Sequence, residues 1–227
     1  MKHPLRVDFA GGWLDVPRLA VPGGYVVNMA VSPLVHLAKD RMVTDRGTVL
    51  PAGSGMGTSA ARAMLESGHP AVAGDFRGGG WQDWAVIKET GICCWASGSK
   101  PDLVLWDDGQ WLKGLLAIHW TGKPHDTAGL LDIPRNYPVI ANASVMAFKA
   151  VERQSVVSLG EAMDMTYELQ LDEGMDELPV FGLAAKYCGS GHGGYAVYLF
   201  ESEAMRDRAV RERCMKPVEP FAEARRI

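Results

Sequence analysis

Glycine is gathered in clusters along this chain, and this pattern limits the possible folds more than any other feature of the sequence. Of the 227 residues, 26 are glycine, and many of them fall at residues 11–12, 53–57 and 189–194. Closely spaced glycines let a backbone turn sharply and present several N–H groups to one anion. The sequence therefore predicts sharp loops at which the backbone itself approaches a ligand or another loop.

The second cluster carries the strongest chemical signal of the three. Residues 51–61 read Pro-Ala-Gly-Ser-Gly-Met-Gly-Thr-Ser-Ala-Ala, and residues 62–67 after them are typical of a short helix. A helix N-terminus adds unpaired N–H donors and the positive end of the helix dipole, so the loop is suited to an anion. Thr58 and Ser59 lie where a hydroxyl can cap the helix or bind Mg²⁺. The loop is not a Walker A motif, because no lysine follows, and a plain capped turn stays an alternative.

Composition and charge exclude several other classes of protein. Hydrophobic residues make up 47% of the chain and charged residues 22%, which is ordinary for a globular domain. The formal net charge of -4 disfavours general binding of nucleic acid. We find no apolar run near the length of a membrane span and no signal peptide, so a soluble, cytoplasmic protein is expected. The cysteines form no C-x-x-C pair and are expected to be free thiols.

Local patterns predict a mixed set of strands and helices. Strands are expected at residues 5–10, at 103–106, 115–120, 139–140 and 195–200, and as a pair within 24–42 on either side of Ser32-Pro33. Helices are expected at 145–171 and 203–214, where apolar residues recur at helical spacing. A glycine-rich connector is expected over residues 68–80.

Four ordered motifs resemble those of the GHMP kinases, the superfamily of galactokinase, homoserine kinase, mevalonate kinase and phosphomevalonate kinase. The first is residues 6–17, R-V-D-F-A-G-G-W-L-D-V-P, and the second is the glycine loop at 51–61, similar to P-x-x-x-G-L-G-S-S-A-A. Trp81-Gln82-Asp83 is similar to a Q-D-Q segment, and residues 185–194, A-K-Y-C-G-S-G-H-G-G, match a K-x-x-G-A-G-G-G-G motif. The chain looks most like the sugar-kinase branch that includes D-glycero-D-manno-heptose 7-phosphate kinase, with shorter intervals between the motifs.

This resemblance implies an α+β fold in two domains. Residues 1–112 would form an N-terminal domain like the second domain of ribosomal protein S5 and would carry the phosphate loop. Residues 113–227 would form a ferredoxin-like C-terminal domain. The site would lie between the two halves, where clefts commonly form.

The resemblance also implies a reaction, in which the γ-phosphoryl group of ATP passes to a hydroxyl of a sugar or sugar phosphate. Asp83 would accept the hydroxyl proton, and Arg6 would be its cationic partner. Substrate would contact Gly12, Asp15 and Gly193, and Thr58 or Ser59 would bind Mg²⁺. The remaining expected contacts are to the ATP phosphates, from Gly53, Ser54, Gly55, Met56, Gly57, Thr58, Ser59, Gly189 and Gly191.

Each of these assignments has a structural alternative. Arg6 and Asp8 fit outward-facing strand residues, and Asp83 fits a cap of a helix that begins at Trp84. Asp15 fits a turn residue, and Lys186 fits a charge at a strand end. Trp13, Trp81 and Trp84 each fit either the wall of a sugar pocket or the core. At the level of function, a GHMP kinase for a non-sugar alcohol and an inactive relative that binds a sugar or nucleotide are the alternatives.

Overall fold

The computed structural model describes residues 1–68, 80–125, 128–130 and 132–224. The predicted connector at 68–80 therefore lies almost wholly outside the described residues. The strands are β1 His3–Ala10, β2 Tyr25–Ala38, β3 Arg41–Thr44, β4 Ile92–Ala96, β5 Leu103–Asp107, β6 Leu116–Trp120, β7 Ala184–Tyr187, β8 Tyr195–Leu199 and β9 Lys216–Pro220. The α-helices are α1 Thr58–Ser67, α2 Gln82–Glu89, α3 Tyr137–Glu152, α4 Val156–Asp172 and α5 Glu203–Glu212, with short 3-10 helices at Pro17–Leu19, Gln110–Leu112 and Ala128–Leu130.

One antiparallel sheet runs through both halves of the chain. Its strand order is β5-β4-β2-β9-β6-β8-β7, and β1 and β3 both pair with β2. The junction between the halves is β9, which pairs with Val31 and Ser32 of β2 on one side and with β6 on the other. The end of the chain therefore joins the N-terminal strands to the C-terminal ones.

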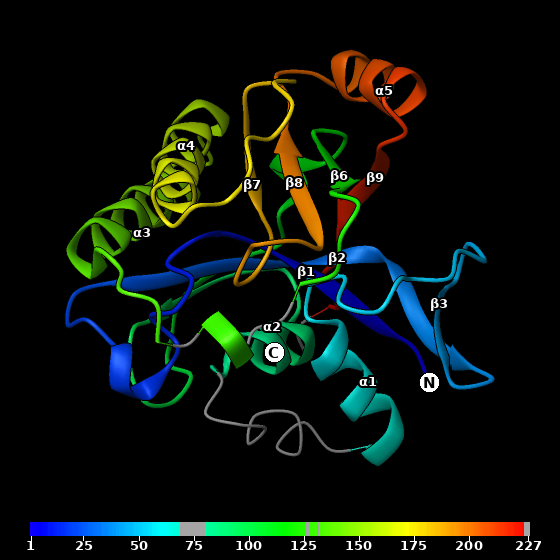
Figure 1. Ribbon diagram of the computed structural model, residues 1–227, viewed down its shortest axis with the longest axis horizontal. Helices are drawn as coiled ribbons and strands as arrows, with labels where there is room; N and C mark the ends of the chain where they lie inside the picture. The colour runs from blue at the N-terminus through cyan, green and yellow to red at the C-terminus, as the bar shows by residue number, and fades with distance from the viewer. Residues whose placement is uncertain (69–79, 126–127, 131, 225–227) are drawn as a thin grey trace.

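Two pairs of helices enclose the strands β1 and β2. In Figure 1, α1 and α2 lie on one side of these strands, and α3 and α4 lie on the other side beside β7. Every residue of β1 after His3 is buried, including the charged Arg6 and Asp8. Both faces of β1 are therefore covered by other parts of the protein. The alternative that Arg6 and Asp8 point outward into solvent is wrong.

The strand pair predicted around Ser32-Pro33 is wrong, because β2 is one strand of 14 residues that continues through the proline. The pairing of β1 with β2 is irregular at this place, where the register shifts between His3 and Leu5, and no partner of Pro33 lies in that ladder. A proline has no N–H to donate, so it is tolerated where strand pairing is interrupted. The residues expected as the second strand belong to β2, and β3, which was not predicted, pairs with this end of β2.

The strand predicted at residues 139–140 is also wrong, because these residues lie in the first turn of α3. Asn136 caps this helix by accepting a hydrogen bond from the Val139 N–H, and Pro138 stands in the first turn, where its missing N–H is not needed. The helix predicted over 145–171 is divided, since Gln154 has a positive φ of 50° and Ser155 caps α4. Strands β4, β7 and β9 were not predicted.

The structure bears on two expectations from the sequence, the state of the cysteines and membrane spans. Cys93, Cys94 and Cys188 are buried, Cys214 is exposed, and all four are free thiols, as expected. No helix in the described part of the chain combines the length and the apolar character needed to cross a membrane.

Candidate active site

The phosphate loop predicted from the second glycine cluster has a tightly turned backbone. Gly53, Gly55, Met56 and Gly57 all have positive φ, and Gly57 is the left-handed residue from which α1 begins. A Cβ at Gly57 would lie 3.0 Å from the Arg6 Cγ, so both conformation and space require glycine there. This is a backbone cradle next to a helix N-terminus, which suits the phosphates of a nucleotide.

The two hydroxyls after this loop have different environments. Thr58 Oγ1 donates to the Gly55 carbonyl at 3.1 Å and lies 3.3 Å from Ser54 Oγ, so it braces the loop. Ser59 is exposed in the first turn of α1. Thr58 does not cap α1, because the capping residue is Gly57, which has no side chain. Both hydroxyl oxygens keep lone pairs that a Mg²⁺ ion could use. No cluster of three or more His, Cys, Asp or Glu side chains within the described ranges could hold a metal ion.

The last glycine cluster packs against the phosphate loop. Tyr195 N–H donates to the Ser54 carbonyl at 3.0 Å, and a Cβ at Gly194 would lie 2.8 Å from the same oxygen. The predicted residues within this loop face different neighbours. Gly189 lies beside Arg6, Gly191 against Met175, and Gly193 against the Pro124 carbonyl. The two loops therefore meet, and of these three glycines only Gly189 touches the pair described next.

Arg6 and Asp83, the two predicted catalytic residues, form an ion pair at the meeting of the loops. Arg6 Nε donates to Asp83 Oδ1 at 2.5 Å. The Arg6 side chain is 4% exposed, whereas that of Asp83 is 32% exposed and so is accessible to a substrate. The capping alternative for Asp83 is wrong, because α2 begins at Gln82 and its capping position is Trp81, with no side-chain cap.

Arg6 also belongs to a longer chain of charges that was not expected from the sequence. Arg6 Nη1 contacts Asp8 Oδ1 at 2.5 Å, and the other oxygen of Asp8 contacts Lys186 Nζ at 2.6 Å. Gly189 N–H donates to Asp8 as well, at 2.8 Å. Burial alone would raise the pKa of Asp8, but Lys186 and Arg6 hold it below its ordinary value.

The signals for this charge chain were present in the sequence. Asp8 stands two residues after Arg6 in a strand, so the two side chains share a face. Lys186 occupies the lysine position of the last motif, where it was interpreted only as a strand-end charge. Its side chain is instead completely buried and reaches from β7 to the Asp8 carboxylate on β1.

The buried carboxylate of Asp15 lies next to the first residue of α2, Gln82. Its two oxygens accept hydrogen bonds from the backbone N–H and the side-chain amide of Gln82, both at 3.1 Å. Burial raises the pKa of Asp15 to about 6, although the hydrogen bond from the Gln82 N–H opposes that rise. Its predicted contact with substrate stays a prediction, since in this structure the carboxylate holds the end of a helix.

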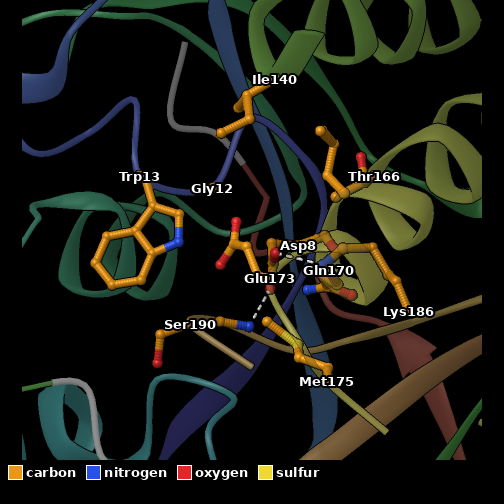
Figure 2. Close-up of a pocket in the computed structure, with 12 residues that line it drawn as sticks. Asp8, Gly12, Trp13, Ile140, Thr166, Gln170, Glu173, Met175, Lys186 and Ser190 are labelled. Carbon is orange, nitrogen blue, oxygen red and sulfur yellow. Dashed lines mark hydrogen bonds and ion pairs between the residues drawn. The ribbon is translucent and has the colours of Figure 1, made fainter. Parts of the chain in front are cut away.

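A pocket opens beside the charge chain, and the space among its lining residues is about 350 Å³ when the open solvent at its mouth is included. Figure 2 shows Glu173 in its centre, with its carboxylate toward Gly12 and Trp13. Asp8 and Gly189 belong to its lining, so the pocket and the Arg6–Asp83 pair are neighbours through Asp8. The lining residues are Asp8, Gly12, Trp13, Ile140, Thr166, Leu169, Gln170, Glu173, Met175, Lys186, Gly189 and Ser190.

Of the three tryptophans considered, Trp13 is the one that lines this pocket. The guanidinium of Arg135 stacks on its ring, 3.8 Å from the ring centroid. Trp81 is buried in the core and donates to the Gly98 carbonyl, and Trp84 packs on the core. Trp13 therefore fits the pocket-wall alternative, and the core alternative holds for the other two.

Comparison with solved structures identifies the fold. The mevalonate kinase of L. major, solved in complex with R-mevalonate, superposes with a TM-score of 0.69 at 14% identity, over 98% of this chain and 96% of that chain. A D-glycero-D-manno-heptose 1-phosphate kinase from Bacteriodes thetaiotaomicron gives 0.65 at 14% identity, over 98% and 96%. Phosphomevalonate kinase of Streptococcus pneumoniae, in complex with phosphomevalonate and AMPPNP, gives 0.66 at 12% identity, over 97% and 99%.

These similarities confirm the mixed α and β fold of the GHMP kinases that the motifs predicted. No family model matches the chain, and no curated protein matches it. At 12% to 14% identity the shared property is the fold, so the chemistry has to be argued from this chain's own residues.

Proposed function

We propose that this chain is a kinase of the GHMP superfamily, which transfers the γ-phosphoryl group of ATP to a hydroxyl of a sugar or sugar phosphate. The observation that carries the proposal is the Arg6–Asp83 pair. A reachable carboxylate is fixed by a buried arginine at the meeting of two glycine loops and beside a pocket. Phosphoryl transfer depends mainly on positioning and charge neutralisation, which such a site supplies.

Asp83 is the proposed general base. The substrate oxygen attacks the γ-phosphorus, the bond to the β–γ bridging oxygen breaks, and ADP leaves with that electron pair. The hydroxyl proton passes to Asp83, whose Oδ1 is already fixed by Arg6. Arg6 is held ionised in turn, since Asp83 and Asp8 raise its pKa against the effect of burial. Its charge also stabilises the negative charge that develops during transfer.

The phosphate loop is the proposed nucleotide site. Its positive-φ backbone and the start of α1 would hold the ATP phosphates, and the hydroxyls of Thr58 and Ser59 would be ligands for Mg²⁺. A bound Mg²⁺ ion would neutralise phosphate charge. The contact between Ser54 and Tyr195 supports the view that the last glycine loop fixes the phosphate loop in place.

The test is ATP consumption across a panel of sugars, sugar phosphates and non-sugar alcohols. We expect substrate-dependent turnover that Asp83→Asn lowers about 10² to 10⁴-fold. Asp40→Asn, an exposed aspartate at the β2–β3 turn, is the matched control and should leave turnover unchanged. Normal turnover in Asp83→Asn would refute the assignment of the base. Ligand binding without turnover by any alcohol would favour an inactive binding relative.

A further inference from the structure

An arginine–carboxylate pair distinct from Arg6–Asp83 stands at this pocket. Arg135 Nε donates to Glu173 Oε2 at 3.1 Å, while its guanidinium stacks on Trp13. The Arg135 side chain is 0% exposed and that of Glu173 is 10% exposed. The three side chains therefore form one packed unit, of which Trp13 and Glu173 line the pocket.

Arg135 supports this unit and does not present its charge to the pocket. Besides the bond to Glu173, Nη1 donates to the Ile133 carbonyl at 3.1 Å and Nη2 to the Leu130 carbonyl at 2.8 Å. Each of its three nitrogens thus has an acceptor within the protein. Although a guanidinium has five N–H donors, the Arg135 side chain is 0% exposed, so the arginine is poorly placed to bind an anion in the pocket.

Glu173 presents a carboxylate to the substrate. It follows directly after α4, and Figure 2 shows the carboxylate directed into the pocket toward Gly12 and Trp13. Oε2 accepts from Arg135, and a carboxylate oxygen has lone pairs for further donors. Hydroxyl groups satisfy those lone pairs, whereas a phosphate or carboxylate in the same place is repelled.

The other polar groups on this side of the pocket are occupied in holding the fold. Gln170 exchanges hydrogen bonds with the backbone of Tyr187, accepting from its N–H and donating to its carbonyl. Thr166 donates to the Ala162 carbonyl, and Ile140 and Met175 are apolar. An aromatic ring, apolar side chains and the Glu173 carboxylate match a sugar, which has C–H faces and hydroxyl edges. The Asp8 carboxylate and the Lys186 ammonium also line the pocket, but they are paired with each other.

We propose that Glu173 determines substrate specificity by accepting hydrogen bonds from hydroxyls of a neutral polyol that packs on Trp13, so the pocket selects an unphosphorylated sugar over its phosphate. This inference rests on the proposed kinase function, because it concerns the acceptor of that reaction. The substrate class is a neutral polyol, and Glu173 is the residue that discriminates the neutral sugar from its phosphate.

Steady-state kinetics with matched pairs test this specificity. The substrates are aldohexoses and aldoheptoses, each compared with the same sugar carrying a terminal phosphate. We expect the neutral sugar to have the higher kcat/KM, and Glu173→Gln to raise its KM about tenfold with a smaller change in kcat. Gln keeps an oxygen for Arg135, so the fold is retained. Glu161→Gln, an exposed glutamate on α4, is the control and should change neither constant.

Calorimetric binding of the same sugars to the wild type and to Glu173→Gln separates this inference from the kinase proposal. Suppose that no sugar is phosphorylated, but that neutral sugars bind and Glu173→Gln weakens this binding about tenfold. The role of Glu173 in sugar binding is then supported, and only the kinase proposal fails. If the phosphorylated sugars are turned over or bound better than the neutral ones, the inference is overturned. It is also overturned if Glu173→Gln leaves neutral-sugar binding unchanged, or if no neutral sugar binds.

Discussion

Two buried arginines hold carboxylates at or beside the same pocket, and the charge of each arginine is compensated in a different way. Arg6 binds Asp83 and Asp8, and Asp8 in turn binds Lys186, so two cations and two anions alternate. Arg135 binds Glu173, and its remaining nitrogens donate to the backbone carbonyls of Leu130 and Ile133. Both guanidinium groups are nearly or fully buried, so the contrast lies in their partners.

The difference shows how each pair can serve its proposed purpose. A buried charge is costly unless opposite charges and hydrogen bonds surround it, and the alternating chain around Arg6 meets that need for four residues together. Removal of one member leaves an uncompensated charge beside the proposed base. The Arg135 pair depends on backbone carbonyls, so the local fold fixes Glu173 in place. The first pair is therefore electrostatically coupled across the sheet, and the second is local.

Removing Arg6 should give the largest effect. We expect Arg6→Met to lower kcat about 10² to 10³-fold, because the variant loses a preorganised cation beside the reacting groups. Steady-state kinetics measure this, with Arg46→Met, an exposed arginine, as the control. Equal losses in Arg6→Met and Arg135→Met would break the contrast between a reactive pair and a supporting one.

Removing Lys186 should affect stability most clearly. Lys186→Met leaves Asp8 with one cation fewer in a buried site, and we expect it to lower the free energy of unfolding by about 3–5 kcal/mol in urea titrations. Asp8→Asn in the same chain removes the orphaned charge, so the double variant should recover part of the loss. Strictly additive losses would show that these charges are not coupled.

Removing Arg135 should cost less. We expect Arg135→Met to lower the free energy of unfolding by about 1–3 kcal/mol, since the groups that it leaves are two carbonyls and a carboxylate at the pocket surface. Burial raises the pKa of Glu173 against the effect of Arg135, so Glu173 can take up a proton more readily when the arginine is absent. Urea titration measures this cost. A loss as large as that of Lys186→Met would contradict the local character of this pair.

Asp15 provides a third case, a carboxylate held by an amide and a backbone N–H in place of an arginine. Its pKa is about 6 in the folded protein and about 4 in an unfolded chain. The folded state therefore binds the extra proton between these values, and the free energy of unfolding falls as pH rises through this window. We expect Asp15→Asn to remove about 3 kcal/mol of this pH dependence. Urea titrations at several pH values check it, and an unchanged profile would contradict the burial argument.

Asp8 should have the opposite dependence on pH. Because Lys186 and Arg6 hold its pKa below the ordinary value, its contribution is present above about pH 4 and is lost on acidification. Asp8, which is paired with cations, should therefore make the free energy of unfolding rise with pH. Asp15, which is held only by hydrogen bonds from Gln82, should make it fall.

The sequence predicted those parts of the site that lie in motifs. Arg6 and Asp83 are 77 residues apart, yet the motif resemblance paired them, and the structure places them 2.5 Å apart. The glycine loops were predicted from composition and spacing alone, because a backbone that turns through positive φ needs glycine whatever the tertiary context. Asp8 and Lys186 lie in the motifs, but the sequence pairs neither of them with a partner: Asp8 fits an outward-facing strand residue as an alternative, and Lys186 fits a charge at a strand end.

The pocket was predicted only in part, because its specific residues are brought together by tertiary packing. Glu173 is one of several acidic residues near the end of α4, and the chain gives no signal that it meets Arg135. The errors in secondary structure have a similar cause. Val139 and Ile140 are β-branched and favour strands, but the cap at Asn136 and the following α3 override that preference.

The most direct test of the account is the fate of the γ-phosphoryl group itself. ATP labelled in its γ-phosphate is incubated with neutral sugars, and the label is followed into the sugar product and into inorganic phosphate. The account predicts that wild type and Glu161→Gln transfer the label to a sugar, and that Asp83→Asn transfers about 10² to 10⁴-fold less. Label that appears only as inorganic phosphate, or equal transfer by Asp83→Asn, would contradict the claim that Asp83 and Arg6 are the site of phosphoryl transfer.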